Sequence, residues 1–107
     1  MSPSPPKEPA LQLSITLPGH GLTIFPLKYG DNVIGRGDAC DVRVQDPEKW
    51  LSRKHAILKV ADERVELVDL AGSNGTFVRG ARIMTAVVVP GSRFTLGPQF
   101  EFSLEKR

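Results

Sequence analysis

The stretch HAILKVADERVELVDL, residues 55–70, contains the clearest structural signal in this 107-residue chain. Apolar residues recur at every second position in both of its arms, and this spacing puts them on one face of a strand: Ala56, Leu58, Val60, Val65 and Leu67. Residues 61–63, Ala-Asp-Glu, form a short polar connection that suits a hairpin. The stretch therefore predicts two antiparallel strands, at 55–60 and 64–70.

Similar short segments lie on both sides of this hairpin, and no window has the periodicity of an amphipathic helix. Glycine and proline turns separate them at roughly 8–12-residue intervals, which predicts a β-sandwich or a β-barrel. The expected strands are 11–17, 22–27, 32–35, 42–44, 76–78, 85–89, 93–96 and 100–104. Residues 1–9 contain four prolines and two serines and are expected to be a disordered leader before a single domain at 10–105.

The composition is that of an ordinary soluble domain, with 40% apolar and 24% charged residues and a net charge of +2. The single cysteine, Cys40, excludes an internal disulfide and fits a reducing compartment. No apolar run approaches the ~20 residues of a membrane span, and prolines stand where a secretory signal would be apolar. A cytoplasmic location is expected, or a nuclear one if the source is eukaryotic, with no membrane partner.

Three short pieces lie in loops between the expected strands and carry polar donors: Gly35-Arg36, Ser52-Arg53-Lys54-His55-Ala56 and Ser73-Asn74-Gly75-Thr76-Phe77. Together they supply a guanidinium, a hydroxyl, a basic pair and an amide, the donor set needed to hold a phosphate on a peptide. These residues in this order resemble the forkhead-associated (FHA) domain, a phosphothreonine-peptide-binding module. The resemblance covers about residues 11–104. It implies an all-β sandwich of two twisted antiparallel sheets, with the binding loops at one end.

Arg36 and Ser52 are the main candidates for phosphate contact. The guanidinium of Arg36 is planar and permanently charged, and we expect it in an exposed loop that the chain enters at an unusual backbone angle through Gly35. Taken alone, Arg36 could also be a solvated loop charge. The resemblance implies phosphate contact for the Ser52 hydroxyl and for Arg53, with Lys54 as a weaker candidate.

The resemblance assigns supporting roles around these donors. It implies that His55 is buried and tethers the binding loops by hydrogen bonds. It implies that Asn74 holds the ligand backbone and that Ser73 lies near the phosphate. Gly75 would supply a positive φ, although Asn-Gly is also a common plain turn, and Thr76 would brace the loop from within.

Two positions depart from the family pattern. Trp50 lies in a longer loop before Ser52, where it is either core packing or an exposed contact for residues flanking the phosphothreonine. Arg79 stands before Gly80, where the family usually has asparagine. This change removes an expected bracing hydrogen bond and adds a positive charge that could influence flanking-residue selectivity.

Catalytic and metal chemistries lack the residues they need. Ser52 and His55 are three apart on an extended segment and point to opposite faces, and no Gly-x-Ser-x-Gly elbow is present. Two histidines and one cysteine far apart do not make a zinc site, and Asp38 and Asp41 are expected to be loop carboxylates rather than calcium ligands. The sequence predicts no enzyme, no metal and no cofactor.

The predicted function is phosphothreonine-dependent binding of a peptide or protein, in signalling or complex assembly. The expected partner is a kinase substrate that carries phosphothreonine. The alternative is a scaffold of the same fold that binds partners without phosphate. Nucleic acid is not expected as a direct ligand, because no aromatic stacking platform or basic helix accompanies the arginines.

Overall fold

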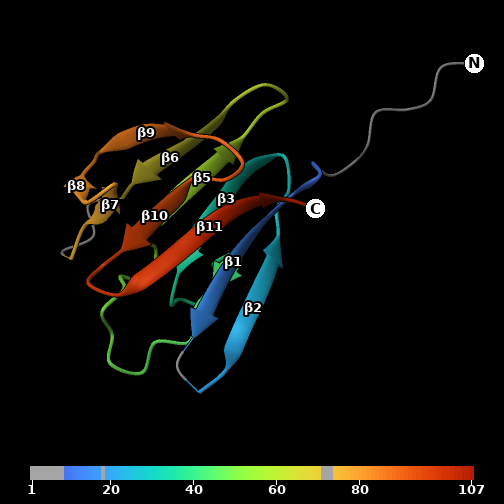
Figure 1. The fold of residues 1–107 in the computed structure, drawn as a ribbon. Helices are drawn as coiled ribbons and strands as arrows, with labels where there is room; N and C mark the ends of the chain where they lie inside the picture. Colours follow the sequence, from blue (N-terminus) through green and yellow to red (C-terminus); the bar gives the residue numbers. More distant parts are fainter. Residues whose placement is uncertain (1–8, 18, 71–73) are drawn as a thin grey trace, which may run out of the picture.

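The structure is a computed structural model that describes residues 9–17, 19–70 and 74–107. Its described residues form two β-sheets packed as a sandwich (Figure 1), which confirms the all-β prediction. The six-stranded sheet has the order β2-β1-β11-β10-β7-β8 and the five-stranded sheet the order β4-β3-β5-β6-β9. The strands are β1 Leu11–Leu17, β2 Gly21–Pro26, β3 Gly30–Gly35, β4 Val42–Arg43, β5 Ala56–Val60, β6 Val65–Asp69, β7 Thr76–Val78, β8 Ala81–Arg82, β9 Thr85–Val88, β10 Arg93–Leu96 and β11 Phe100–Lys106.

The hairpin at 55–70 forms the middle of the five-stranded sheet. β5 pairs antiparallel with β6, from Ala56 opposite Asp69 to Val60 opposite Val65, and β3 and β9 flank this pair. One pair departs from the antiparallel pattern, because β3 and β4 run parallel, with Gly35 opposite Arg43. Sequence analysis did not predict β8, which has only two residues.

The core lies between the inward faces of the two sheets. Leu58 and Leu67 from the five-stranded sheet are fully buried, as are Phe94 and Phe102 from the six-stranded sheet. The two phenylalanine rings are cross-strand partners and stack with centroids 5.3 Å apart. Aromatic pairs of this kind contribute about 0.5–1.5 kcal/mol beyond their area burial. The core therefore fixes the sheets from which the loops extend.

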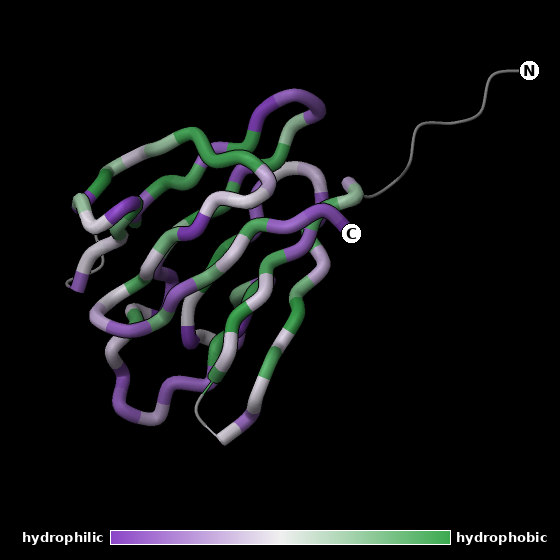
Figure 2. Tube along the Cα trace, viewed as in Figure 1, coloured by the Kyte–Doolittle hydropathy of each residue, from purple (hydrophilic) through white to green (hydrophobic). Residues whose placement is uncertain are grey.

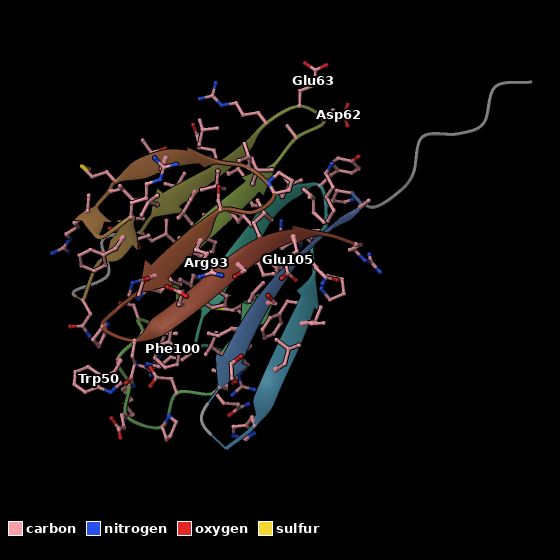
Figure 3. All side chains as sticks on the ribbon, in the orientation of Figure 1. Trp50, Asp62, Glu63, Arg93, Phe100 and Glu105 are labelled. Atoms are coloured by element: carbon pink, nitrogen blue, oxygen red, sulfur yellow. The ribbon has the colours of Figure 1, made fainter. Side chains whose placement is uncertain are left out.

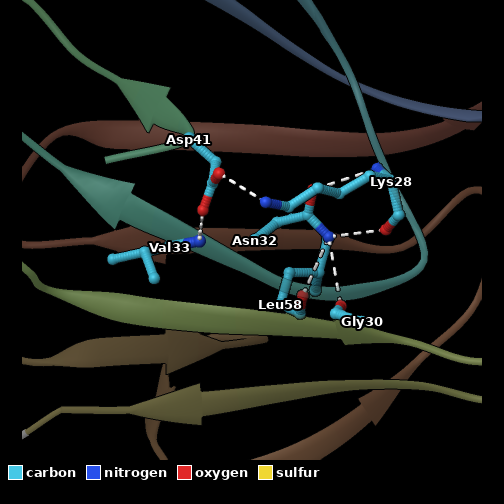
Figure 4. A network of polar contacts seen from close by, with 6 residues as sticks. All are labelled: Lys28, Gly30, Asn32, Val33, Asp41 and Leu58. Atoms are coloured by element: carbon cyan, nitrogen blue, oxygen red, sulfur yellow. Dashed lines mark hydrogen bonds and ion pairs between the residues drawn. The ribbon is translucent and has the colours of Figure 1, made fainter. Parts of the chain in front are cut away.

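A small polar network fixes the end of the connection between β3 and β4 (Figure 4). The carboxylate of Asp41 accepts hydrogen bonds from Lys28 Nζ at 2.8 Å and from the Val33 N–H at 2.9 Å. These hydrogen bonds, chiefly the one from Lys28, hold the pKa of Asp41 below its ordinary value. Asp41 is thus a structural carboxylate that fixes the residue before β4. Beside it, the buried amide of Asn32 donates to the carbonyl of Leu58 at 3.2 Å and ties β3 to β5.

The turn between β7 and β8 is strained at Arg79. Val78 pairs with Ala81, so Arg79 and Gly80 are the two central residues of a tight hairpin, and their φ values are 53° and 79°. Positive φ at both positions is the signature of a type I′ turn, which favours asparagine or glycine at the first position. A long side chain at such a position costs about 1–2 kcal/mol.

We therefore expect Arg79→Asn to raise the free energy of unfolding by about 0.5–1 kcal/mol, because asparagine tolerates the left-handed conformation. Denaturant unfolding monitored by circular dichroism measures the change. Arg79→Ala is the matched control, since it removes the same charge but keeps the strain and should give no gain. Equal stabilisation by both substitutions would show that charge, not backbone strain, is relieved.

Candidate functional site

Four consecutive backbone carbonyls, those of residues 50–53, lie at the centre of the end of the sandwich where the loops around Arg36, Ser52 and Asn74 meet. We call this region the loop end. The Trp50 carbonyl accepts from Asn74 Nδ2 at 2.6 Å and the Leu51 carbonyl from Arg36 Nε at 2.7 Å. The Ser52 carbonyl accepts from the Arg36 N–H at 3.3 Å, and the Arg53 carbonyl from the Gly37 N–H at 3.0 Å. These hydrogen bonds bring the three sequence pieces together, although they are far apart along the chain.

Gly35 is needed here for space. A Cβ at Gly35 would lie 2.3 Å from the Arg53 carbonyl oxygen and 2.8 Å from that of Ser52. Its φ is not among the positive values, so the unusual backbone angle expected from the sequence is not the reason for glycine. The absence of a side chain lets the two loop backbones touch.

Arg36 is half-buried, whereas the sequence suggested an exposed loop residue. Its Nε–H is used on the Leu51 carbonyl, and this contact fixes the direction of the guanidinium. A guanidinium has five N–H donors, so four remain for a ligand. The result is a pre-oriented cation that cannot lose its proton.

Ser52 and Arg53 lie beside this guanidinium. Ser52 is partly exposed, so its hydroxyl can be reached from solvent. The side chains of Arg53 and Lys54 are both exposed. The backbone of Arg53 is also fixed by the Cys40 thiol, which donates to the Arg53 carbonyl oxygen at 2.8 Å. Burial raises the pKa of the Cys40 thiol and so keeps this S–H donor protonated.

His55 connects two of the loops from inside the molecule. It is fully buried, its Nδ1 accepts the Ser52 N–H at 3.1 Å, and its Nε2 lies 2.7 Å from the Gly75 carbonyl oxygen. A neutral ring protonated at Nε2 satisfies both contacts, and this tautomer is assigned from its partners. A hydrolase role has no support, because both ring nitrogens are occupied by backbone groups.

The third piece of the motif is held just as firmly. Gly75 is buried with a φ of 83°, and a Cβ there would lie 3.0 Å from Arg82 Nε. Thr76 is fully buried and donates its hydroxyl to Asp69 at 2.6 Å. Asn74 is exposed, but its amide nitrogen already holds the Trp50 carbonyl. Ser73 lies outside the described residues.

Trp50 is a surface residue. It is 39% exposed, and its indole N–H donates to Glu48 at 2.6 Å, while the neighbouring Leu51 is buried in the core. Figure 3 shows its side chain at the loop end, close to Phe100. The loop before Ser52 is mainly hydrophilic (Figure 2). A hollow of about 250 Å³ lies beside the indole and is lined by residues from strand ends and loops: Thr16, Leu17, His20, Gln45, Asp46, Pro47, Glu48, Gln99 and Phe100.

Two arginines are placed differently from what the sequence suggested. Arg79 lines a hollow formed with Val87–Arg93 and does not line the hollows that contain Arg36. Arg43, which the sequence indicated only as part of an expected strand at 42–44, lies next to Arg36. Its Nε is 3.5 Å from the Arg36 carbonyl oxygen, and both side chains line one hollow. Only the parallel β3–β4 pairing, which the sequence does not reveal, places it there.

The described residues contain no group of side chains suited to holding a metal ion. They also include no helix long and apolar enough to cross a membrane. The site that the structure presents is a set of fixed hydrogen-bond donors and cations at one end of a sandwich. Such a set can bind an anion, and its neighbouring hollows can accept an extended chain.

Comparison with known proteins agrees with this arrangement. The family model of the FHA domain matches residues 32–97, which include all three sequence pieces, and the chain belongs to this family. A curated relative is the FHA domain-containing protein FhaA of Mycobacterium tuberculosis, 33% identical over 79 residues. The match covers 74% of this chain but only 14% of that protein.

Solved FHA domains share the fold. The FHA domain of FhaA, complexed with the intracellular domain of Rv3910, superposes with a TM-score of 0.77 at 28% identity, over 89% of this chain and 99% of that one. A domain from a structural and functional study of phosphothreonine-dependent FHA domain interactions gives a TM-score of 0.79, also at 28% identity, over 91% and 96% of the two chains. The FHA domain is a binding module rather than an enzyme.

We expect His55→Ala to lower the free energy of unfolding by about 2–4 kcal/mol, because it opens a cavity and leaves the partly buried Ser52 N–H without its acceptor. Thermal and denaturant unfolding measure the loss. Ser52→Ala is the matched control at the same loop, since it removes only a hydroxyl and should change stability within about 0.5 kcal/mol. An unchanged melting midpoint in His55→Ala, together with lost ligand binding, would make His55 a ligand-contacting residue instead.

Proposed function

We propose that this chain is a phosphothreonine-dependent peptide-binding module for signalling or complex assembly. The observation that carries the proposal is the fixed guanidinium of Arg36, held by the Leu51 carbonyl next to the partly exposed Ser52. Its ligand is a phosphothreonine-containing segment of a kinase substrate. The domain spans about residues 10–105, with β11 reaching Lys106, and acts in the cytoplasm or, in a eukaryote, the nucleus.

In this proposal the phosphate contacts Arg36, the Ser52 hydroxyl, Arg53 and Ser73. Charge-assisted hydrogen bonds contribute about 1.5–3 kcal/mol each, so three or four supply most of a micromolar affinity after ordering costs. The site is largely pre-formed, because backbone hydrogen bonds already fix Arg36 and Arg53. The ligand therefore has to order few of these side chains when it binds.

The ligand backbone lies along the loop end. The side-chain oxygen and the second N–H of Asn74 bind it, because only one N–H of the amide is used on the Trp50 carbonyl. The exposed face of Trp50 and its neighbouring hollow receive side chains that flank the phosphothreonine. Titration with an oriented phosphothreonine-peptide library, with unphosphorylated and phosphoserine controls, tests the function as a whole. Equal binding of the unphosphorylated library would instead favour the phosphate-independent scaffold.

We expect Arg36→Ala to reduce affinity for a library-selected phosphothreonine peptide at least about 100-fold, measured by calorimetry. It removes a charge-assisted contact and a fixed positive charge from the site. The cost in stability should be about 1 kcal/mol, the contribution of one hydrogen bond to the Leu51 carbonyl. Arg36→Lys is the control, because it keeps the charge but loses the fork and should bind with intermediate affinity. Near-normal affinity in a folded Arg36→Ala protein would exclude the assignment.

Affinity should also fall as the pH drops through the second ionisation of the phosphate, at about pH 6. The ligand then loses charge while Arg36 and Arg53 keep theirs, so the dianion binds better than the monoanion. The same pH series with His20→Gln is the control for a contribution from a histidine near the site, because His20 lines a hollow beside Arg36. Constant affinity between about pH 7.5 and 5 would show that the second phosphate charge is not read.

A further inference from the structure

One edge of the six-stranded sheet carries no charged residue. β2 ends that sheet and pairs only with β1 among the described strands (Figure 1). It has six residues, and the side chains of Leu22 and Ile24 are 66% and 47% exposed. Natural proteins usually protect such an edge with charges, a bulge or a covering loop. Residues 9–27 contain no aspartate, glutamate, lysine or arginine, although 24% of the chain is charged. The edge therefore lacks the charges that keep other strands away.

The backbone of β2 directs hydrogen-bonding groups outward at alternate residues. Antiparallel strands exchange hydrogen bonds at every second pair. The Leu27 N–H donates to the Leu11 carbonyl at 3.1 Å, and this contact sets the phase of the β1–β2 ladder. The backbone of Thr23 is therefore bonded to β1, whereas the N–H and C=O groups of Leu22 and Ile24 point away from it. Within the described part of the chain, no hydrogen bond outside the sheet ladders occupies these two backbones.

The edge of β2 is complementary to a second copy of itself. When two β2 strands run antiparallel about a two-fold axis at Thr23, Leu22 of one copy lies opposite Ile24 of the other. Each of these two pairs exchanges two hydrogen bonds, so the outward backbone groups of both residues are satisfied. The exposed side chains of the same residues meet across the strands as apolar pairs. Pro26, at the next outward position, has no N–H to add and marks the end of the pairing.

We propose that β2 is a self-association edge, through which two copies of this chain join their six-stranded sheets into one. A second copy fits this edge because an uncharged strand meets no like-charge repulsion from its own copy. The two-fold register at Thr23 also pairs every outward backbone group of Leu22 and Ile24. Two short strands bury less than the ~1,200 Å² of a stable interface, so the dimer is weak, with a Kd on the order of 100 µM.

The edge strand of the other sheet, β9, is less suited to such pairing. It has four residues, and the N–H of Val89, just beyond it, donates to the Ser92 hydroxyl at 3.0 Å. The exposed Val87 and Val89 line a hollow together with Arg79 and Gly80 of the β7–β8 turn. A charged residue therefore lies beside this edge, as one does not beside β2. The remaining edges, β4 and β8, have two residues each.

The arrangement of the dimer has a consequence for binding, and this consequence, unlike the dimer itself, rests on the proposed function. β2 begins at Gly21 beside the loop end, because the preceding His20 lines a hollow together with Arg36. Antiparallel strands related by a two-fold axis begin at opposite ends. The two phosphopeptide sites therefore face away from each other. Such a dimer joins two separate ligands rather than two positions of one short peptide.

Sedimentation equilibrium of the full 107-residue chain, without ligand, tests the association. We expect the weight-average mass to rise toward that of a dimer between about 10 µM and 1 mM protein. Ile24→Lys places a charge on the edge, and Ile24→Pro removes an outward N–H without breaking a bond to β1. Each should weaken association at least about tenfold while melting as a folded protein. Val87→Lys is the matched control, since it adds the same charge to an exposed residue of β9 and should associate like the native chain.

Cysteine cross-linking identifies the strand and the register. In the proposed pairing Thr23 faces its own copy as a non-hydrogen-bonded pair, whose Cα atoms are about 4.5 Å apart and can carry a disulfide. We expect Thr23→Cys to form a covalent dimer under mild oxidation. The native chain, whose single cysteine is Cys40, should not. Ala86→Cys, in the middle of β9, is the matched control for the other edge.

Three outcomes overturn the inference. The first is a monomer at about 1 mM protein, the second is association that survives both Ile24 substitutions, and the third is cross-linking of Ala86→Cys in place of Thr23→Cys. None of these measurements contains a phosphopeptide, so their failure leaves the proposed function intact. Conversely, a dimer that binds no phosphothreonine peptide supports the association edge and overturns only the proposed function.

Discussion

The loop end depends on the clamped backbone of residues 50–53. Each of its four carbonyls accepts a hydrogen bond from a segment distant in sequence, and the Ser52 N–H is bound from inside by His55. A backbone segment outside the sheets would otherwise leave these groups to water. Here these carbonyls accept hydrogen bonds from Arg36 and Asn74 and so align the two loops that contain these residues. The binding geometry is therefore a property of the backbone, and the functional side chains are fixed through it.

The need to hold these backbone segments together explains why a glycine and two buried polar residues are part of the motif. Gly35 permits the contact between the two backbones because a Cβ would overlap the Arg53 carbonyl. His55 is suited to its place because one neutral ring can accept from one loop and donate to another across a buried gap. Thr76 performs a similar function toward Asp69 at the base of the third loop. These three residues support the site without facing the ligand.

Much of the fold was predictable from local patterns. The alternation in residues 55–70 gave β5 and β6 to within a residue, because one face of each strand is buried and the other is not. β8 was missed because a two-residue strand has no period to detect. The parallel β3–β4 pair was missed because pairing direction depends on the path of the chain rather than on composition. Arg43 was overlooked for the same reason, since its neighbours come from that pairing.

The distribution of charge over the surface was even less predictable from the sequence than the strand pairing. A net charge of +2 over 107 residues gives no indication of a polyelectrolyte surface, and the only adjacent basic pair near the motif is Arg53-Lys54. Folding brings Arg36 and Arg43 next to this pair and directs Asp41 toward Lys28, away from the hollow that these cations line. Opposite charges that balance in the sequence are thus separated in space. Affinity for anions follows from this separation, because Coulomb interactions depend on distance and on exposure to water rather than on the total charge.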